Sequence, residues 1–246
     1  MRIPFLAARQ TESRRASAAL RPSDDGDVDL FGQLIELTRA DFQHKLLEHS
    51  LAGMMRDGSV KLGHYRAYLR ETWHLVRHTP AIFELGAARV PDSRPGLCAW
   101  MLEQAAEERG HDQLCARDLR RVGGDCESLP SGRPGVGVWG LVTQDYYYAL
   151  QGNPAGLLGT ASLSEELGAT LAEPAARALL AALHLPRAAL GFIIGHGNFD
   201  QKHFEDARRA VNSLLLPDEF EELLHARRMA IAHCAQLLTD IIATPG

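Results

Sequence analysis

The chain has 246 residues, of which 46% are hydrophobic, and this length and composition allow a sizeable buried core. Its formal net charge of −5 argues against a nucleic-acid-binding protein, which more often concentrates basic residues on one face. No apolar run reaches the roughly 18 residues that a membrane span needs, and the first residues, MRIPFLAARQTESRR, lack the continuous apolar segment of a secretory signal. We therefore expect a cytoplasmic protein that binds neither nucleic acid nor membrane.

The first 28 residues differ in character from the rest of the chain. They are rich in Arg, Ser, Ala and Asp and show no sustained apolar period, which predicts a flexible N-terminal tail. The folded domain is expected to span residues 29–246.

From residue 29 onward the apolar pattern is helical almost throughout. Apolar residues recur at intervals of three and four, glycine and proline separate the segments, and alternating strand patterns are absent. The predicted helical segments are 30–55, 61–78, 81–90, 96–122, 138–152, 154–172, 174–184, 188–215 and 217–242. The pattern indicates an all-α single domain, a bundle of about seven to eight helices.

One short stretch, HGNFDQKH at residues 196–203, carries the clearest chemical signal. At 100° per residue, His196, Asp200 and His203 lie at 0°, 40° and about −20° around a helix, so one narrow stripe carries all three. The stretch follows the apolar segment LGFIIG, which places the stripe on the inward face of its helix. Polar side chains on an inward face need a partner, and a metal ion is one candidate.

A metal site also needs ligands from other helices. The chain contains three Glu-x-x-His pairs, each weak evidence alone, and one of them, Glu108 with His111, lies in the middle of the long helix predicted at 96–122. Glu165 lies in a segment of small residues, where an acid has few local partners. We expect the adjacent Glu166 to be solvated. The other two pairs are Glu71/His74 and Glu222/His225.

Taken in order, EERGHDQ…DLRRVGG, Gly159-x5-Glu165 and HGNFDQKH resemble the heme-oxygenase-like diiron oxidases, a group of iron-containing redox enzymes. The resemblance covers roughly residues 35 to 240. It implies the helical fold of heme oxygenase and two iron ions on three core helices. Carried over by position, the implied ligands are Glu108, His111, Glu165, His196, Asp200 and His203, with Glu166 a rival for Glu165 if the helix register is shifted. A family variant that separates the first Glu and His by six residues does not fit, because Gln104 stands at that position.

The resemblance also implies a function. It predicts a nonheme diiron oxidase or oxygenase, with O2 as co-substrate, acting on a small amino-acid-like or fatty-acid-like molecule by N-oxygenation, oxidative C–C cleavage or desaturation. Glu108, Glu165 and Asp200 would be the catalytic carboxylates, because carboxylates can change between bridging and terminal positions as iron changes oxidation state. The side chains considered for the substrate side, with core packing as the alternative, are Tyr68, Trp73, His74, His78, Tyr146, Tyr147 and Tyr148.

Other readings remain open at this point. A heme-binding or heme-degrading oxygenase would use a single histidine near the start of the domain, His44 or His49. A ferritin-like protein would use Glu71 and His74, which in the leading reading could instead orient a ligand or form an exposed pair. Thiaminase II-like hydrolysis needs an activated cysteine, and none of the four shows recognisably activating surroundings. A non-catalytic helical interaction protein would bind no iron. An electron donor and a homodimer are compatible with the sequence, which identifies neither.

Overall fold

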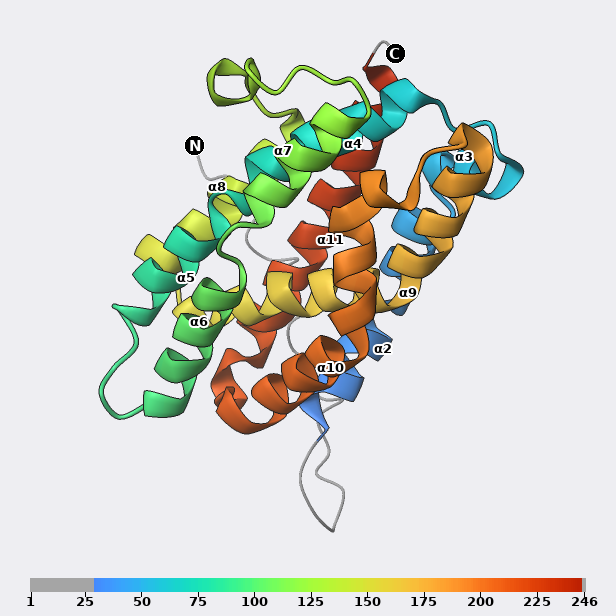
Figure 1. The fold of residues 1–246 in the computed structure, drawn as a ribbon. Helices are drawn as coiled ribbons and strands as arrows, with labels where there is room; N and C mark the ends of the chain where they lie inside the picture. Colours follow the sequence, from blue (N-terminus) through green and yellow to red (C-terminus); the bar gives the residue numbers. More distant parts are fainter. Residues whose placement is uncertain (1–28, 245–246) are drawn as a thin grey trace, which may run out of the picture.

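The computed structural model describes residues 29–244, apart from the side chains of residues 196–203. Every regular element in that part of the chain is helical, which confirms the all-α prediction (Figure 1). The α-helices are α2 (Leu30–Phe42), α3 (Ser50–Asp57), α4 (Leu62–Val76), α5 (Thr79–Ala87), α6 (Pro95–Glu107), α7 (His111–Arg121), α8 (Val136–Leu150), α9 (Leu157–Leu183), α10 (Gly191–Leu214) and α11 (Phe220–Ala243). The shorter turns are the π-helical η1 (Gln43–Leu47) and the 3-10 turns η2 (Leu129–Ser131), η3 (Pro154–Gly156), η4 (Arg187–Leu190) and η5 (Pro217–Glu219).

Four predicted segments are divided or merged in the observed structure. The segment 30–55 is divided, because η1 interrupts it and His49 caps a new helix by accepting a hydrogen bond from the Leu51 amide (3.2 Å). The segment 96–122 is also divided, between α6 and α7, where Gly110 has φ +92°, a conformation that favours glycine. The segments 154–172 and 174–184 instead form one helix, α9, with Pro174 inside it.

Helix α9 changes direction along its length (Figure 1). Pro174 cannot donate to the carbonyl of Thr170, and its ring crowds that carbonyl, so a proline inside a helix bends it. Packing against α10 and α11 keeps both halves helical despite that cost. The longest helix of the described chain is therefore α9, rather than the predicted helix at 96–122.

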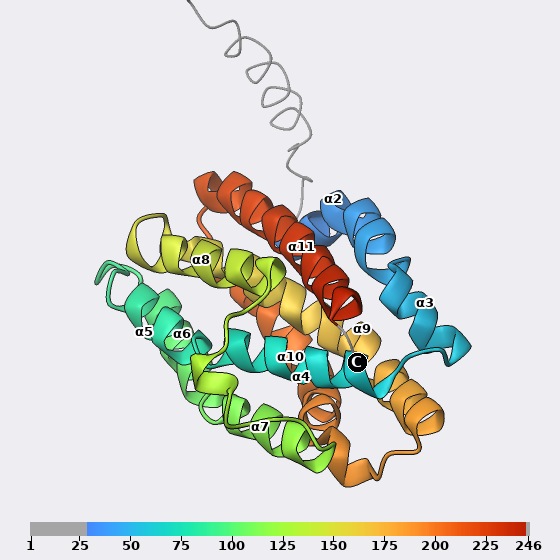
Figure 2. The same cartoon turned by 90° about the horizontal axis from the view of Figure 1, so that it is seen from above.

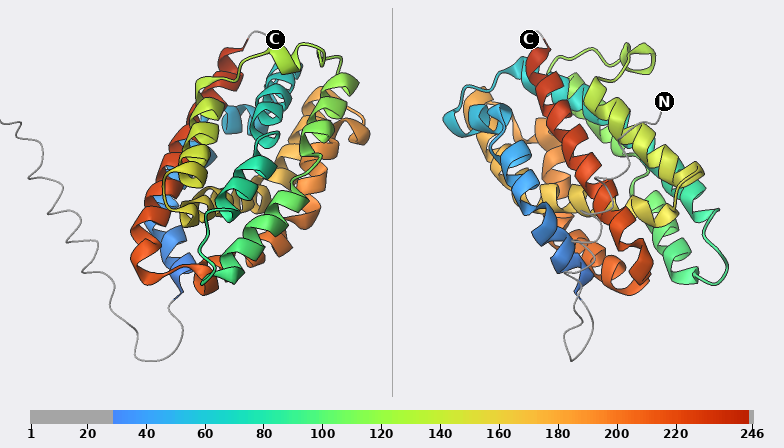
Figure 3. Two further views of the ribbon diagram at one scale, coloured as in Figure 1. Left: turned by 90° about the vertical axis from the view of Figure 1, so that its left-hand side faces the viewer. Right: turned by 180° about the vertical axis from the view of Figure 1, so that it is seen from behind.

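Helix α4 lies inside the bundle. It packs against α7 on one side and against α8 and α11 on the other (Figure 2). Helices α8 and α11 lie side by side at the edge of the molecule (Figures 2 and 3). Helices α9 and α10 pack against each other, α9 also contacts α11, and α10 also contacts α7. Among the described residues, no helix is both long enough and apolar enough to cross a membrane.

Glycine allows α8 and α11 to approach closely. A methyl group at Gly137 would overlap the backbone of Leu237, and one at Gly140 would overlap the ring of His233. The first turn of α8 is also held by side chains from its neighbours. Asp240 accepts a hydrogen bond from the Gly137 amide at 2.8 Å. These contacts fix α8 against the last helix of the chain.

Asp145 on α8 is a buried carboxylic acid that accepts a hydrogen bond from the Thr160 hydroxyl (2.7 Å). Burial raises its pKa to about 7. The folded protein therefore holds a proton that the unfolded chain releases, so the free energy of unfolding falls as pH rises from about 4 to about 7. At roughly 1.4 kcal/mol per pKa unit, this effect reaches at most about 4 kcal/mol.

We expect Asp145→Asn to be more stable than wild type at pH 8 and equally stable near pH 4, because the amide still accepts from Thr160 and carries no charge. Urea unfolding at pH 4, 6 and 8 checks this. A stability difference that is the same at all three pH values would show that Asp145 does not titrate in this range.

The N-terminal tail prediction concerns residues that lie outside the described part of the chain. Helix α2 has its own cap, because Asp29 accepts a hydrogen bond from the Gly32 amide at 2.9 Å. We therefore expect a protein that begins at Asp29 to keep the helical circular-dichroism spectrum, the melting temperature and the metal content of the full chain. Loss of any of the three would place part of residues 1–28 in the folded domain.

Candidate metal centre

The predicted Glu-x-x-His pair lies at the junction of α6 and α7, not in the middle of one helix as predicted. Glu108 is the C-cap of α6, Gly110 turns the chain, and His111 opens α7. The His111 amide donates to the Glu108 carbonyl (3.3 Å), and the two side chains meet at 2.8 Å between Nδ1 and Oε2. The turn therefore keeps the pair together although the helix breaks there.

The pair is half-buried, with about a fifth to a quarter of each side chain exposed (21% for His111 and 24% for Glu108). Burial by itself lowers the pKa of His111, but the hydrogen bond and the negative charge of Glu108 outweigh it and raise the net pKa above the ordinary value. A carboxylate and an imidazole at this separation are a pair of ligand types that iron accepts.

Helix α7 holds the start of α10. Asp118 is fully buried, and it accepts a hydrogen bond from the Phe192 amide at 2.6 Å. A carboxylate at the first turn of a helix is stabilised by the unpaired amides and dipole there. The ring of Phe192 then stands edge-on to the His111 ring, with 6.2 Å between their centroids. Sequence reasoning did not identify Asp118 as the residue that brings α10 to His111.

Glu165 and Glu166 lie on different sides of α9. Glu165 lines a small cavity together with Trp100 and Gln104 of α6 and with Asp206 of α10. This side of α9 is the one that faces the helices carrying the other predicted ligands. Asp206 was not among the predicted residues; it follows His203 by three residues and lies about 60° from it around the helix.

Glu166 is not solvated, contrary to prediction. Only 16% of its side chain is exposed, and it forms an ion pair with Arg227 of α11, which is fully buried. The guanidinium also donates to the hydroxyls of Thr38 (3.0 Å) and Ser162 (2.9 Å). Burial raises the pKa of Glu166, and the positive charge of Arg227 opposes that rise. Glu166 therefore belongs to a buried network of hydrogen bonds and an ion pair that joins α2, α9 and α11.

The side chains of His196, Asp200 and His203 lie outside the described residues. The backbone of α10 is helical through all three positions. At 100° per residue, positions 196, 200 and 203 fall within the same arc of about 80° as Phe192 and Ala207, which are both buried. Phe192 contacts His111, and Ala207 borders the cavity of Glu165. The triad positions thus lie along α10 between the two other groups of predicted ligands.

Among the side chains that the structure describes, no cluster of three or more His, Cys, Asp or Glu residues is arranged to hold a metal ion. Three of the six predicted ligands fall outside that set. The complete ligand set therefore stays a prediction.

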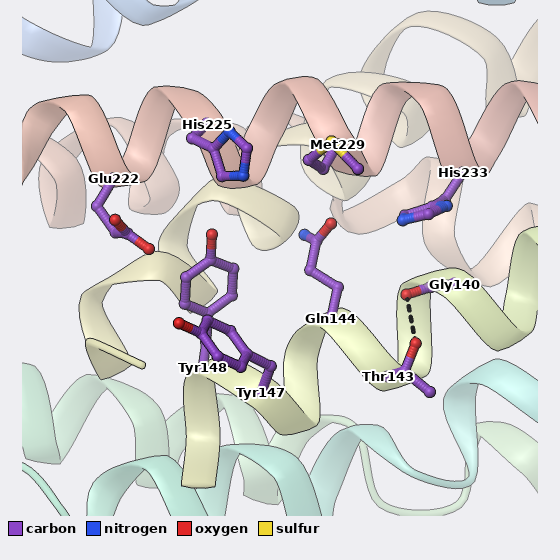
Figure 4. Close-up of a pocket in the computed structure, with 9 residues that line it drawn as sticks. All are labelled: Gly140, Thr143, Gln144, Tyr147, Tyr148, Glu222, His225, Met229 and His233. Atoms are coloured by element: carbon purple, nitrogen blue, oxygen red, sulfur yellow. Dashed lines mark hydrogen bonds between the residues drawn. The ribbon is translucent and has the colours of Figure 1, made fainter. Parts of the chain in front are cut away.

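The other two Glu-x-x-His pairs lie elsewhere in the fold. Glu71 accepts a hydrogen bond from the Gly135 amide (2.8 Å) at the start of α8, and His74 is buried against the ring of Trp73. Glu71 thus holds the residue that precedes α8 and is not part of an exposed pair. Glu222 and His225 line an open groove between α8 and α11, with a volume of about 560 Å³ (Figure 4).

The aromatic residues predicted for the substrate side lie in different parts of the fold. Tyr68 of α4 packs edge-on to Phe192 with 6.5 Å between ring centroids, so it belongs to the aromatic layer that reaches His111. Tyr147 and Tyr148 instead line the groove between α8 and α11. Tyr146 faces His78, whose Nδ1 is 3.2 Å from its hydroxyl. Among these residues, Tyr68 is the one whose ring contacts link it, through Phe192, to His111.

Residues required by the alternative readings have other roles. His44 lies on the surface beside Glu48, and His49 caps α3, so both candidate heme ligands are engaged locally. Burial raises the pKa of Cys115 and Cys126, and it raises that of Cys234 to about 12. These three thiols are therefore protonated at neutral pH, which disfavours them as nucleophiles.

Comparison with known proteins adds independent information. A sequence model of the family described as iron-containing redox enzymes matches residues 66–237. A search of the curated proteins found no match.

Solved structures with the same fold cover most of the chain. One, from Shewanella denitrificans, is a domain of unknown function with a heme oxygenase-like fold; it is 22% identical, covers 87% of this chain and 92% of its own, and has a TM-score of 0.79. A TenA homolog from Pseudomonas syringae pv. tomato is 15% identical, covers 88% and 93%, and has a TM-score of 0.71. A TenA homologue from P. horikoshii is 15% identical, covers 88% and 98%, and has a TM-score of 0.68.

The structural likeness shows the fold, and the sequence match covers more than half of the chain, including the junction of Glu108 and His111, the cavity of Glu165 and the whole of α10. The chain therefore belongs to the family of iron-containing redox enzymes and has the heme oxygenase-like fold.

Proposed function

We propose that this protein is a nonheme diiron oxidase or oxygenase that uses O2 to oxidise a small organic substrate. The observation that carries the proposal is the convergence on α10. The Glu108–His111 pair reaches it through Phe192, and Glu165 borders it through a cavity shared with Asp206 and Ala207. Between those two contacts α10 carries the sequence His-x3-Asp-x2-His. Family membership supports iron as the metal.

The donor set fits two iron ions chemically. Three carboxylates would supply anionic oxygens, each able to bind one iron ion or both, and three histidines would supply neutral imidazoles. The carboxylates are Glu108, Glu165 and Asp200, and the histidines are His111, His196 and His203. Iron held by these residues would supply the electrons for the reduction of O2. At the described pair, Glu108 raises the pKa of His111, so a proton competes with a metal ion for this imidazole.

The surroundings of the pair favour a substrate with an apolar part. Phe192 and Tyr68 form an aromatic layer next to His111, and Trp100 borders the cavity of Glu165. Such a wall excludes water and packs against a hydrocarbon chain or an aromatic side chain. We propose a fatty-acid-like or amino-acid-like molecule as the substrate, oxidised by N-oxygenation, C–C cleavage or desaturation.

We also propose a separate electron donor. Full reduction of O2 takes four electrons, whereas an N-oxygenation or a desaturation withdraws two from the substrate. The remaining two electrons must come from another molecule.

Anaerobic titration with Fe(II), followed by Mössbauer spectroscopy before and after O2, tests the proposal. We expect up to two irons per chain and a coupled diferric species after O2. A reproducible maximum of one iron without coupling would contradict the diiron assignment. An intense Soret band after addition of hemin, without uptake of Fe(II), would indicate a heme protein instead.

A further inference from the structure

The outer face of α8 is unusually apolar for a surface helix. Val136, Trp139, Tyr147 and Leu150 are respectively 70%, 63%, 56% and 45% exposed. Figure 2 shows α8 at the edge of the molecule, with α11 beside it. At 100° per residue these four positions and Thr143 fall within an arc of about 80°, so they form one stripe along the helix. We call these five residues the α8 stripe.

Charge is missing from this face. The only charged residue of α8 is Asp145, and it is buried. A solvated helix face normally carries charged side chains, whereas the core of a protein–protein interface is depleted of charge and enriched in Trp and Tyr. The α8 stripe therefore has the composition of an interface core.

The α8 stripe is also symmetric about its centre. Val136 and Leu150 lie seven residues on either side of Thr143, and Trp139 and Tyr147 lie four residues on either side. An interface between two identical chains related by a two-fold axis must be self-complementary: where residue i of one copy meets residue j of the other, residue j of the first copy meets residue i of the second. A symmetric apolar stripe meets that condition when two copies of the helix run antiparallel.

We propose that two copies of this chain associate through α8, antiparallel, with the two-fold axis at Thr143. Trp139 of each copy then meets Tyr147 of the other, and Val136 meets Leu150. The antiparallel arrangement also brings Arg133, which precedes α8, towards the Glu221–Glu222 end of the groove on the other copy. Opposite charges at the rim favour this orientation over the parallel one.

The groove beside the stripe provides room for the partner. Its volume of about 560 Å³ lies between α8 and α11, and Tyr147, Met229 and His225 line it (Figure 4). Because Tyr147 lines this groove, the indole of Trp139 from the second copy is placed at its edge. Met229 is 38% exposed, and its flexible thioether can adapt to an incoming side chain.

The surface area that a stable dimer must bury requires that both α8 and α11 contact the second copy. At 150 to 250 Å² for a whole aromatic side chain, the exposed parts of Trp139 and Tyr147 amount to about 200 to 300 Å². A stable interface buries about 800 Å² on each partner. The contact must therefore extend across the groove to the exposed face of α11. This contact is independent of the proposed metal centre.

Sedimentation velocity of the full chain over a range of concentrations tests the association. We expect wild type to be a dimer at micromolar concentrations and Trp139→Lys to dissociate at least about 30-fold more readily, the effect of losing a central tryptophan. Leu102→Lys on α6 is the matched control, since Leu102 is 49% exposed and lies outside α8 and α11, and it should remain dimeric. Circular dichroism should be unchanged in both, because neither side chain is buried.

Cysteine cross-linking tests the register. In the proposed dimer, Thr143→Cys places the thiol of each copy beside the same thiol of the other copy at the two-fold axis. We therefore expect a disulfide-linked dimer after mild oxidation. Val136→Cys is equally accessible, but it lies seven residues, about 10 Å along the helix, from the axis and should not link to itself. The double variant Val136→Cys/Leu150→Cys should link between copies. Wild type under the same oxidation controls for its four native cysteines.

Several outcomes would overturn the proposal. If the wild-type protein is monomeric at tens of micromolar, the α8 stripe does not bind a second copy of this chain and the proposal is wrong. A dimer that survives Trp139→Lys, or that Leu102→Lys also dissociates, would use another surface. Dissociation by Trp139→Lys without a cross-link at position 143 would exclude this two-fold arrangement.

Discussion

The Glu165→Gln protein is expected to bind at most one iron per chain and to lose O2-dependent turnover while remaining folded. Glutamine keeps the size of the side chain, but it removes the negative charge that the proposed iron site would need from this ligand. Loss of an outer partner of a metal ligand already costs about 10- to 100-fold in affinity, and we expect a larger loss for a ligand itself. Glu165 is half-buried beside Gln104 and Asp206, so glutamine can be accommodated there.

Two control variants make this test specific. Glu107→Gln removes an exposed acid one residue from Glu108 and should leave both irons in place. Glu166→Gln should keep the iron but lower the melting temperature, because it weakens the pair with Arg227. Iron content by anaerobic titration and melting of each apo protein separate the two effects. If Glu166→Gln loses iron while Glu165→Gln retains it, the neighbouring glutamate is the ligand and our assignment is wrong.

Arg227→Met is expected to be the most destabilising single substitution considered for this protein. The guanidinium is fully buried and holds Thr38 of α2, Ser162 of α9 and the carboxylate of Glu166. Methionine fills much of the volume but leaves Glu166 without its cation in a largely buried position. Breaking a buried ion pair by removing one partner costs about 3 to 5 kcal/mol. For a chain of this size that lowers the melting temperature by roughly 6 to 20 °C.

The double variant Arg227→Met/Glu166→Met identifies the cause. It should recover most of the lost stability, because replacing both members of a buried pair with apolar residues is often neutral or stabilising. The hydroxyls of Thr38 and Ser162 already donate to carbonyls within their own helices, both at 2.8 Å, so they keep partners without the guanidinium. Urea unfolding of the single and double variants measures this. Equal losses in both would mean that packing, not charge, dominates at this position.

The helical fold was largely predictable from the sequence. Apolar residues at intervals of three and four mark one face of a helix whatever the helix packs against, so the spacing alone predicts an all-α protein. The order and spacing of Glu108, His111, Glu165 and the His-x3-Asp-x2-His stretch identified the family, because those positions follow from the chain itself.

Helix ends were predicted less well, because local signals compete with packing. The apolar spacing predicted one helix over residues 96–122, but the chain turns at Gly110. A left-handed backbone conformation there costs glycine little. Proline at position 174 did not end α9, since contacts with α10 and α11 outweighed one lost hydrogen bond.

Tertiary structure alone decided which neighbouring side chain faces which partner. Glu165 and Glu166 are adjacent and chemically identical, and only the position of Arg227 on α11 shows that Glu166 serves the core while Glu165 borders α6 and α10. The same holds for the three Glu-x-x-His pairs, which look alike in the sequence. One binds the backbone just before α8, one lines a surface groove, and one meets α10 through Phe192. Spacing along a chain sets which residues share a helix face, but packing between distant segments sets what that face contacts.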